Sequence, residues 1–209
     1  MRVLLVDDHA IVREGLKKVL AAMQGTVEVG EAADAAQALQ LVRKAQWDCA
    51  LVDIVMPGQT GLELVKELQR LQPKLPVLIL SMFPEEQYAV RMLRAGASGY
   101  LNKESATEQL VSAIRVVMSG GKYVSPKMAT QIATDVSLSS KRPPHEALSD
   151  REFTVLRLMA AGVSGKEIAR EISISNKTVS TYRSRILKKL NLRNNAQLVA
   201  YAVKNNLFQ

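Results

Sequence analysis

The sequence has little of several residue types that mark common classes of protein. One cysteine, Cys49, stands among 209 residues, which excludes an intramolecular disulfide and a zinc site built on cysteines. Two histidines, His9 and His145, are too few and too far apart for a histidine metal site. No apolar run approaches the ~18 residues of a membrane-spanning helix. Acidic residues begin at Asp7, whereas a secretory signal has a basic start followed by an apolar stretch. We therefore expect a cytoplasmic protein that does not span a membrane, in which Cys49 is a small buried hydrophobe.

The overall composition is that of a globular protein, but charge is distributed unevenly along the chain. Hydrophobic residues make up 47% of the chain, enough to bury a core, and charged residues 23%. The formal net charge is +8, yet residues 1–120 hold 13 basic and 14 acidic residues, whereas residues 121–209 hold 15 and 6. This distribution favours a polyanionic partner for the C-terminal part, nucleic acid first and an anionic membrane surface second. A solvated basic face without a ligand is the remaining alternative.

Short apolar runs alternate with helical patterns five times in the first part of the chain. Near-continuous apolar strands separated by helices are typical of a parallel sheet covered on both faces. We predict an α/β doubly wound domain with a five-stranded parallel sheet, in the flavodoxin-like order 2-1-3-4-5. The expected strands are 3–6, 27–30, 49–52, 77–80 and 99–101.

The alternating pattern ends near Gly120. Ser125 followed by proline predicts one more short helix through about Val136, and residues 137–144 have two prolines and no apolar periodicity, as linkers do. We therefore expect three parts: a first domain at 1–120, a linker with a short helix at 121–147, and a second domain at 148–209.

The second domain has the pattern of four short helices. Ser-x-x-Glu capping boxes at Ser149 and Ser164 open the first two, and the others are expected at about 176–190 and 196–204. Two helices joined by a short turn, the second of which is rich in basic residues, form the helix-turn-helix pattern. We predict a small all-α helix-turn-helix domain.

Polar residues follow four strands of the predicted sheet. Asp7 and Asp8 end the first strand and Asp53 the third, so three carboxylates converge where the strands' carboxyl ends meet. Such carboxylates repel one another unless a divalent ion neutralises them, and oxygen ligands suit Mg²⁺. With Lys103 as a cation and Ser81 as a hydroxyl donor, an aspartate here can be the nucleophile of phosphoryl transfer. Taken singly, these aspartates have another interpretation, as caps of the first helix or of the turn after the third strand.

These residues lie within longer motifs that resemble a known domain. Val6-Asp7-Asp8-His9, residues 53–58, Ser81 and residues 99–103 are similar to the receiver domain of two-component response regulators, and the resemblance covers the whole first part. It implies that Asp53 accepts a phosphoryl group from a sensor histidine kinase. Many receivers have proline after the lysine, where this chain has glutamate, so no cis peptide bond is implied there.

The resemblance also assigns roles around Asp53. Lys103 and Ser81 would bind the phosphoryl oxygens, and Tyr100 would turn inward as Ser81 moves; the alternative for Tyr100 is an ordinary strand residue with a polar tip. The implied Mg²⁺ ligands are Asp8, Asp53 and the backbone carbonyl of Val55, with Asp7 acting through water.

The second domain resembles another known module. Residues 148–152, 162–169 and 174–179, with Lys188-Lys189-Leu190, look like the LuxR-type DNA-binding domain, and a receiver joined to it is typical of the NarL/FixJ family. The helix expected at 176–190 fits a major groove and carries basic and hydroxyl side chains, among them Lys177. By the resemblance, Ser180, Thr181 and Ser184 face bases, while Lys166, Thr178, Tyr182, Arg185 and Lys188 approach phosphates.

The function expected is that of a phosphorylation-dependent, DNA-binding transcription regulator. We expect it to form a homodimer on activation, to bind paired half-sites in double-stranded DNA, and to catalyse only its own phosphorylation and dephosphorylation. One alternative is a receiver that controls a protein- or RNA-binding module. Another is an aspartyl-phosphate phosphotransferase or phosphatase of the haloacid-dehalogenase kind, although Asp7-Asp8-His9 lacks the Asp-x-Asp motif of those enzymes.

Overall fold

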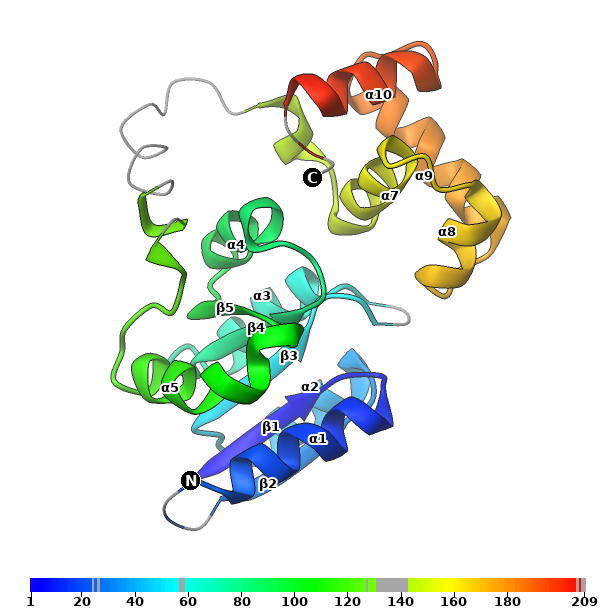
Figure 1. Ribbon diagram of the computed structural model, residues 1–209. Helices are drawn as coiled ribbons and strands as arrows, with labels where there is room; N and C mark the ends of the chain where they lie inside the picture. Colours follow the sequence, from blue (N-terminus) through cyan, green and yellow to red (C-terminus); the bar gives the residue numbers. More distant parts are fainter. Residues whose placement is uncertain are drawn as a thin grey trace. The chain divides into compact units, whose positions relative to one another are not determined.

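The structure is a computed structural model of the 209-residue chain, and it divides into two compact units, Met1–Asp135 and Val136–Gln209. Each unit is described by itself (Figure 1). The described residues are 1–23, 25, 27–56, 59–126, 128–130, 143–205 and 207, without the side chains of residues 86, 87, 105 and 107.

The first unit has the alternating order that the sequence predicts. Its elements are β1 (Arg2–Val6), α1 (Ala10–Ala21), β2 (Glu28–Ala32), α2 (Ala35–Lys44), β3 (Cys49–Asp53), α3 (Gly61–Leu71), β4 (Val77–Ser81), α4 (Glu85–Arg94), β5 (Gly99–Asn102), the 3-10 helix η1 (Lys103–Ser105) and α5 (Ala106–Met118). The strands pair in parallel in the order β2-β1-β3-β4-β5, which confirms the predicted doubly wound sheet. The observed strands begin and end within two residues of the expected ones, as is usual at element ends.

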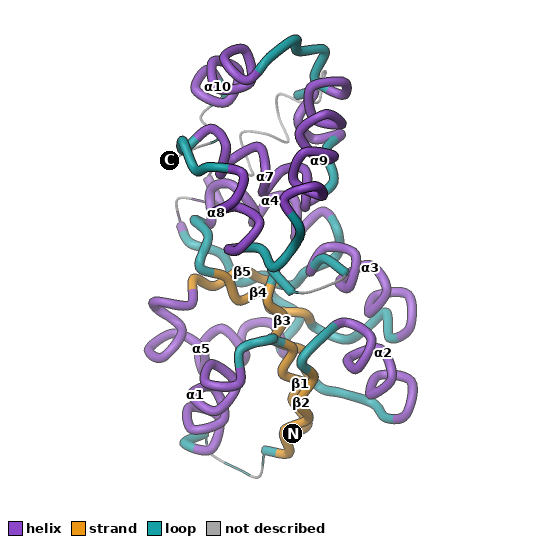
Figure 2. Tube along the Cα trace, turned by 90° about the vertical axis from the view of Figure 1, so that its right-hand side faces the viewer, coloured by secondary structure: helices purple, strands orange, loops and turns teal. Residues whose placement is uncertain are grey.

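Helices cover both faces of the sheet. Figure 2 shows α1 and α5 on one side of the strands and α2 and α3 on the other. On the α1/α5 side, alternate strand residues such as Leu5 and Leu51 pack against Leu20 and Leu110. Cys49 is fully buried in the same cluster, as expected. Every residue of β3 and β4 is buried, which explains why these strands read as continuous apolar runs.

The chain leaves α5 along the free edge of β5. The Tyr123 carbonyl accepts from the Tyr100 amide at 2.9 Å, and the Tyr123 amide donates to Ser98 O at 2.9 Å. A Cβ at Gly99 would lie 2.7 Å from Tyr123 O, so this close approach requires glycine. Ser125 then caps the next turn by accepting from the Met128 amide at 3.1 Å, and the rest of the expected short helix lies outside the described residues.

The second unit is all-helical in its described part. Its elements are η2 (Pro144–Ala147), α7 (Asp150–Ala160), α8 (Gly165–Glu171), α9 (Asn176–Lys189) and α10 (Asn195–Lys204). Both expected capping boxes are present, at Ser149 and at Ser164. Helix α9 packs against α7 and α8, with Val179 and Ile186 buried, while its other sides remain open to solvent.

Candidate functional site

The sheet register brings the predicted acidic site together. Val6 pairs with Val52, so Asp7 follows beside Asp53 at the ends of adjacent strands. Asp53 pairs with Leu80, and Ser81 pairs with the residue that precedes Lys103. The predicted polar residues therefore end four strands at one edge of the sheet.

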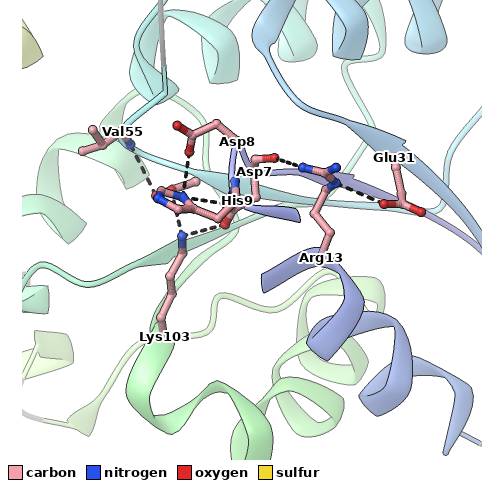
Figure 3. Close-up of polar contacts among 8 residues, drawn as sticks. Asp7, Asp8, His9, Arg13, Glu31, Val55 and Lys103 are labelled. Carbon is pink, nitrogen blue, oxygen red and sulfur yellow. Dashed lines mark hydrogen bonds and ion pairs between the residues drawn. The ribbon is translucent and has the colours of Figure 1, made fainter. Parts of the chain in front are cut away.

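The centre of the site is a lysine between two buried carboxylates (Figure 3). Lys103 Nζ donates to Asp7 Oδ2 at 2.6 Å and to Asp53 Oδ2 at 2.7 Å. Both aspartates are at least 94% buried at their side chains, and the lysine is 11% exposed. Charge-assisted hydrogen bonds of this kind hold all three groups in fixed positions.

Burial and neighbouring charges shift the titration of these groups. Burial, helped by the nearby Asp7, raises the pKa of Asp53 to about 6, although Lys103 opposes the shift. Burial also opposes the charge on Lys103, but Asp53 and Asp7 outweigh it, so the pKa of Lys103 lies above its ordinary value. At neutral pH the pair is therefore an ammonium beside a carboxylate.

The acidic residues have the geometry of a cation site. Asp7, Asp8, His9 and Asp53 each offer a ligand atom, and these atoms lie within 4.8 Å of one another. Asp8 Oδ1 is buried and accepts no hydrogen bond from the described residues, although His9 Nδ1 lies 2.9 Å away. A buried carboxylate oxygen with unfilled hydrogen-bonding capacity fits a hard divalent cation, since oxygen ligands suit such ions.

The alternative interpretation of the aspartates as caps is partly wrong. The N-cap of α1 is His9, which makes no side-chain capping bond, so neither Asp7 nor Asp8 caps this helix. Asp53 does accept from the Val55 amide, at 3.3 Å, in the turn after β3. That bond aims the carboxylate, while the metal-binding role of the Val55 carbonyl stays a prediction.

Arg13 is a member of the site that sequence reasoning missed. It donates from Nη1 to the Asp7 carbonyl at 2.7 Å and from Nε to Glu31 at 3.0 Å (Figure 3). Lys17 also reaches Glu31, at 2.7 Å, so β2, α1 and the end of β1 are joined. The available signal was weak, since an arginine one turn into an amphipathic helix is usually a solvated residue.

Ser81 and Tyr100 belong to one hydrogen-bonded loop. Ser81 Oγ accepts from the Phe83 amide at 3.0 Å, and the Tyr100 hydroxyl donates to Phe83 O at 2.8 Å. Tyr100 is 2% exposed, so its ring lies inward, and Phe83 stacks on Tyr88 at 5.0 Å. In the described part of the chain, nothing accepts the proton of the Ser81 hydroxyl, which leaves it for a ligand oxygen.

A glycine lets α3 approach the site. The Gly61 amide donates to Ile54 O at 3.0 Å, and a Cβ at Gly61 would lie 2.6 Å from Asp53 O and 2.7 Å from Ile54 Cα. Thr60 fixes the same helix end through a capping box with Glu63. The backbone of Asp53 is thus positioned by direct contact with the first turn of α3.

The second candidate site is the open side of α9. The predicted DNA-contacting residues on this helix include five at the helical spacing of one face, and all five are exposed: Lys177, Ser180, Thr181, Ser184 and Lys188. Arg185 and, on α8, Lys166 are exposed as well, while Thr178 and Tyr182 are half-buried.

Lys189 of α9 has a different setting from its basic neighbours. Its Nζ donates to Glu152 Oε2 at 2.6 Å and to the Ala147 carbonyl at 3.3 Å. Glu152 is 3% exposed and is also the capping-box residue of Ser149. Lys189 therefore fixes α9 against α7, and the sequence alone gave no sign that it differs from Lys188.

Comparison with known proteins assigns both units. Residues 3–115 match the response regulator receiver domain, and residues 146–202 match the bacterial regulatory proteins of the luxR family. The chain belongs to the NarL/FixJ family of response regulators. Both resemblances seen in the sequence are confirmed, and the chain is a receiver joined to a LuxR-type DNA-binding domain.

Relatives of this response regulator match it along its whole length. It is 38% identical to the oxygen regulatory protein NreC of Staphylococcus carnosus, over 99% of each chain. It is 36% identical to the response regulator GacA of Pseudomonas aeruginosa, over 99% of this chain and 97% of GacA.

A solved structure shares the two-domain architecture. RcsB from Salmonella enterica serovar Typhimurium, bound to promoter rprA with the phosphomimetic BeF₃⁻, is 28% identical, covers 97% of this chain and 98% of RcsB, and gives a TM-score of 0.61. In the described part of this response regulator, no helix has both the length and the apolar character needed to cross a membrane.

Proposed function

We propose that a sensor histidine kinase phosphorylates this response regulator on Asp53, and that the phosphorylated form binds double-stranded DNA as a homodimer on paired half-sites and so regulates transcription. The observation that carries the proposal is the buried Asp53 carboxylate, bonded to Lys103 at a receiver's acidic edge. The LuxR-type domain and the DNA-bound relative RcsB support the second half. Since a bacterial chromosome lies in the cytoplasm, the proposal places the protein there.

The proposed chemistry is the transfer of a phosphoryl group from a histidine nitrogen of the kinase to a carboxylate oxygen of Asp53. An oxygen of Asp53 attacks the phosphorus of a phosphohistidine, a P–O bond forms, the P–N bond breaks, and the imidazole leaves with the electron pair. Lys103 lies where it can neutralise charge on the transferred oxygens, and Ser81 offers its hydroxyl proton to one of them. With a pKa of about 6, Asp53 is a carboxylate at neutral pH, as the attack requires.

We assign Mg²⁺ to the acidic cluster as its cofactor. Asp8, Asp53 and the Val55 carbonyl would bind it, with Asp7 acting through water. The buried Asp8 Oδ1, which accepts no hydrogen bond from the described residues, supports this assignment. When bound, the ion neutralises negative charge on the carboxylates and the phosphoryl oxygens.

The chain holds two matched domains with a segment between them. We propose the receiver at 1–120, the linker at 121–147 and the DNA-binding domain at 148–209. The boundary between the two compact units falls after residue 135, inside this linker. The exposed face of α9, with Arg185 of the same helix, Lys166 of α8 and the half-buried Thr178 and Tyr182, is the proposed DNA-contacting surface.

A small phosphodonor tests the site directly. We expect the wild-type chain with Mg²⁺ to incorporate phosphate from acetyl phosphate, and Asp53→Asn to incorporate none, because the nucleophilic oxygen pair is gone. Glu104→Gln, an exposed carboxylate next to Lys103, is the matched control and should label like the wild type. Unchanged labelling of Asp53→Asn would move the phosphoacceptor to another residue.

A further inference from the structure

The exposed face of α9 has an uncharged centre between two charged ends. Lys177 and Lys188 stand at the ends, and Ser180, Thr181 and Ser184 lie between them at the spacing of a single helical face. The exposed Arg185 lies at the margin of this face, one turn beyond Thr181, and Arg183 is half-buried and bonds Asn195 at 2.5 Å. The three central residues themselves lack the side chains that read guanine or adenine through two hydrogen bonds.

Each of the three hydroxyls already uses its proton within the helix. Ser180 donates to the Asn176 carbonyl, Thr181 to the Lys177 carbonyl and Ser184 to the Ser180 carbonyl, each at 3.1 Å. A hydroxyl has one proton and two lone pairs. In this arrangement, therefore, all three oxygens present lone pairs to the solvent.

Acceptor-only side chains suit some base edges and not others. In the major groove the exocyclic amines, adenine N6 and cytosine N4, donate, whereas guanine N7 and O6 only accept. Guanine would place two acceptors against this surface, and a bond to either would require a hydroxyl to give up its bond within the helix. The thymine methyl of an A·T pair has an apolar partner in the γ-methyl group of Thr181, which a C·G pair cannot match.

We propose that Ser180, Thr181 and Ser184 are specificity-determining residues that select A·T pairs at the centre of each half-site. They accept hydrogen bonds from the adenine N6 amine, and Thr181 also contacts the thymine methyl. Lys177 and Lys188 then supply the donors at the flanks. This inference rests on the proposed DNA-binding function, which it deepens by naming the bases.

The experiment begins with selection of duplexes from a randomised library by the full chain, with Mg²⁺ and beryllofluoride. We expect A·T pairs at the half-site centre. In a selected duplex, replacing a central adenine by purine, which lacks the N6 amine, should weaken binding about fivefold, the size of one net hydrogen bond. Replacing the paired thymine by uracil, which lacks the methyl, should weaken it about three- to fourfold.

Two variants of Thr181 separate its contacts. Thr181→Val keeps the methyl and removes the acceptor, so it should lose sensitivity to purine while remaining sensitive to uracil. Thr181→Ser keeps the acceptor and removes the methyl, so it should lose sensitivity to uracil while remaining sensitive to purine. Ser112→Ala, which removes an exposed hydroxyl that bonds its own helix in α5 of the receiver, is the control and should leave both sensitivities unchanged.

The outcomes distinguish the inference from the function beneath it. Selection of G·C pairs at the centre overturns the inference, and so does binding by the wild-type chain that is indifferent to both purine and uracil. Both of these measurements use the wild-type chain, so they test the inference even if a substitution unfolds the domain. Failure of the activated chain to bind any duplex contradicts the proposed function itself.

Discussion

At the residue scale, two contacts hold the proposed phosphoacceptor Asp53: Lys103 bonds its carboxylate at 2.7 Å, and Gly61 of α3 packs against its backbone carbonyl. Asp7, Asp53, Ser81 and Lys103 were predictable because each follows an apolar run, and parallel strands end at the same edge. Arg13 was not predictable in the same way. Its role depends on the distance between α1 and the Asp7 carbonyl, which no local pattern in the sequence encodes.

Gly61→Ala tests the contact that positions the phosphoacceptor. The new Cβ would lie 2.6 Å from Asp53 O, so α3 or the end of β3 must shift. We expect a loss of about 1 to 3 kcal/mol in unfolding free energy and slower phosphorylation by acetyl phosphate. Urea titration and labelling rates measure the two effects.

The chain provides a matched glycine for this experiment. A Cβ at Gly15, in α1, meets nothing within 4 Å, so Gly15→Ala should be neutral or stabilising through helix propensity. If Gly61→Ala behaves like Gly15→Ala, α3 does not constrain Asp53.

At the scale of elements, the helix-turn-helix was predictable from the sequence. The contact that holds α9 against α7 was not. The capping boxes at Ser149 and Ser164 are local patterns, and the structure has both. In sequence, Lys188 and Lys189 are equivalent neighbours on a basic helix. Only the packing of α9 on α7 brings one of them to the buried Glu152.

Glu152→Gln tests the Lys189 contact through its pH dependence. Burial opposes the charge on Glu152, but bonds from Lys189 and Ser149 outweigh it and hold its pKa below the ordinary 4.5. The stabilisation is therefore present above about pH 4.5 and is lost as pH falls through the lowered pKa. We expect the variant to lose about 1 to 2 kcal/mol at pH 7 and less in acid.

Urea titrations followed by the amide signals of α7 and α9 measure this difference. Glu167→Gln is the control, because Glu167 has the same capping-box bonds to Ser164 in an exposed setting. A loss at Glu152 no larger than at Glu167 would mean that Lys189 adds nothing to the stability of the second unit.

Lys188→Ala tests the other lysine at the same end of α9. A lysine that contacts a phosphate releases a counterion, so we expect weaker binding to every duplex and a salt dependence whose slope falls by about one. Gel shifts over a range of salt concentrations measure it. Lys66→Ala, the same charge change in receiver helix α3, should leave the slope as it is, and an unaltered slope for Lys188→Ala would remove Lys188 from the phosphate contacts.

At the scale of the whole molecule, the uneven distribution of charge along the chain agrees with the different functions proposed for its two parts. The near-neutral first part contains the buried acidic site, and the basic excess lies with the helix-turn-helix unit. Composition alone predicted two functions in one chain. It could not predict how one part controls the other, because that control depends on a difference in free energy between two states and not on either state alone.

The central claim is that the phosphoryl group on the receiver controls DNA binding, and sedimentation tests it most directly. The full chain is sedimented with Mg²⁺ and duplex DNA, with and without beryllofluoride, beside Asp53→Asn. We predict that beryllofluoride drives the wild-type chain into dimers on DNA and tightens binding, and that Asp53→Asn does not respond. Equal DNA binding by the wild-type chain with and without beryllofluoride would contradict the claim.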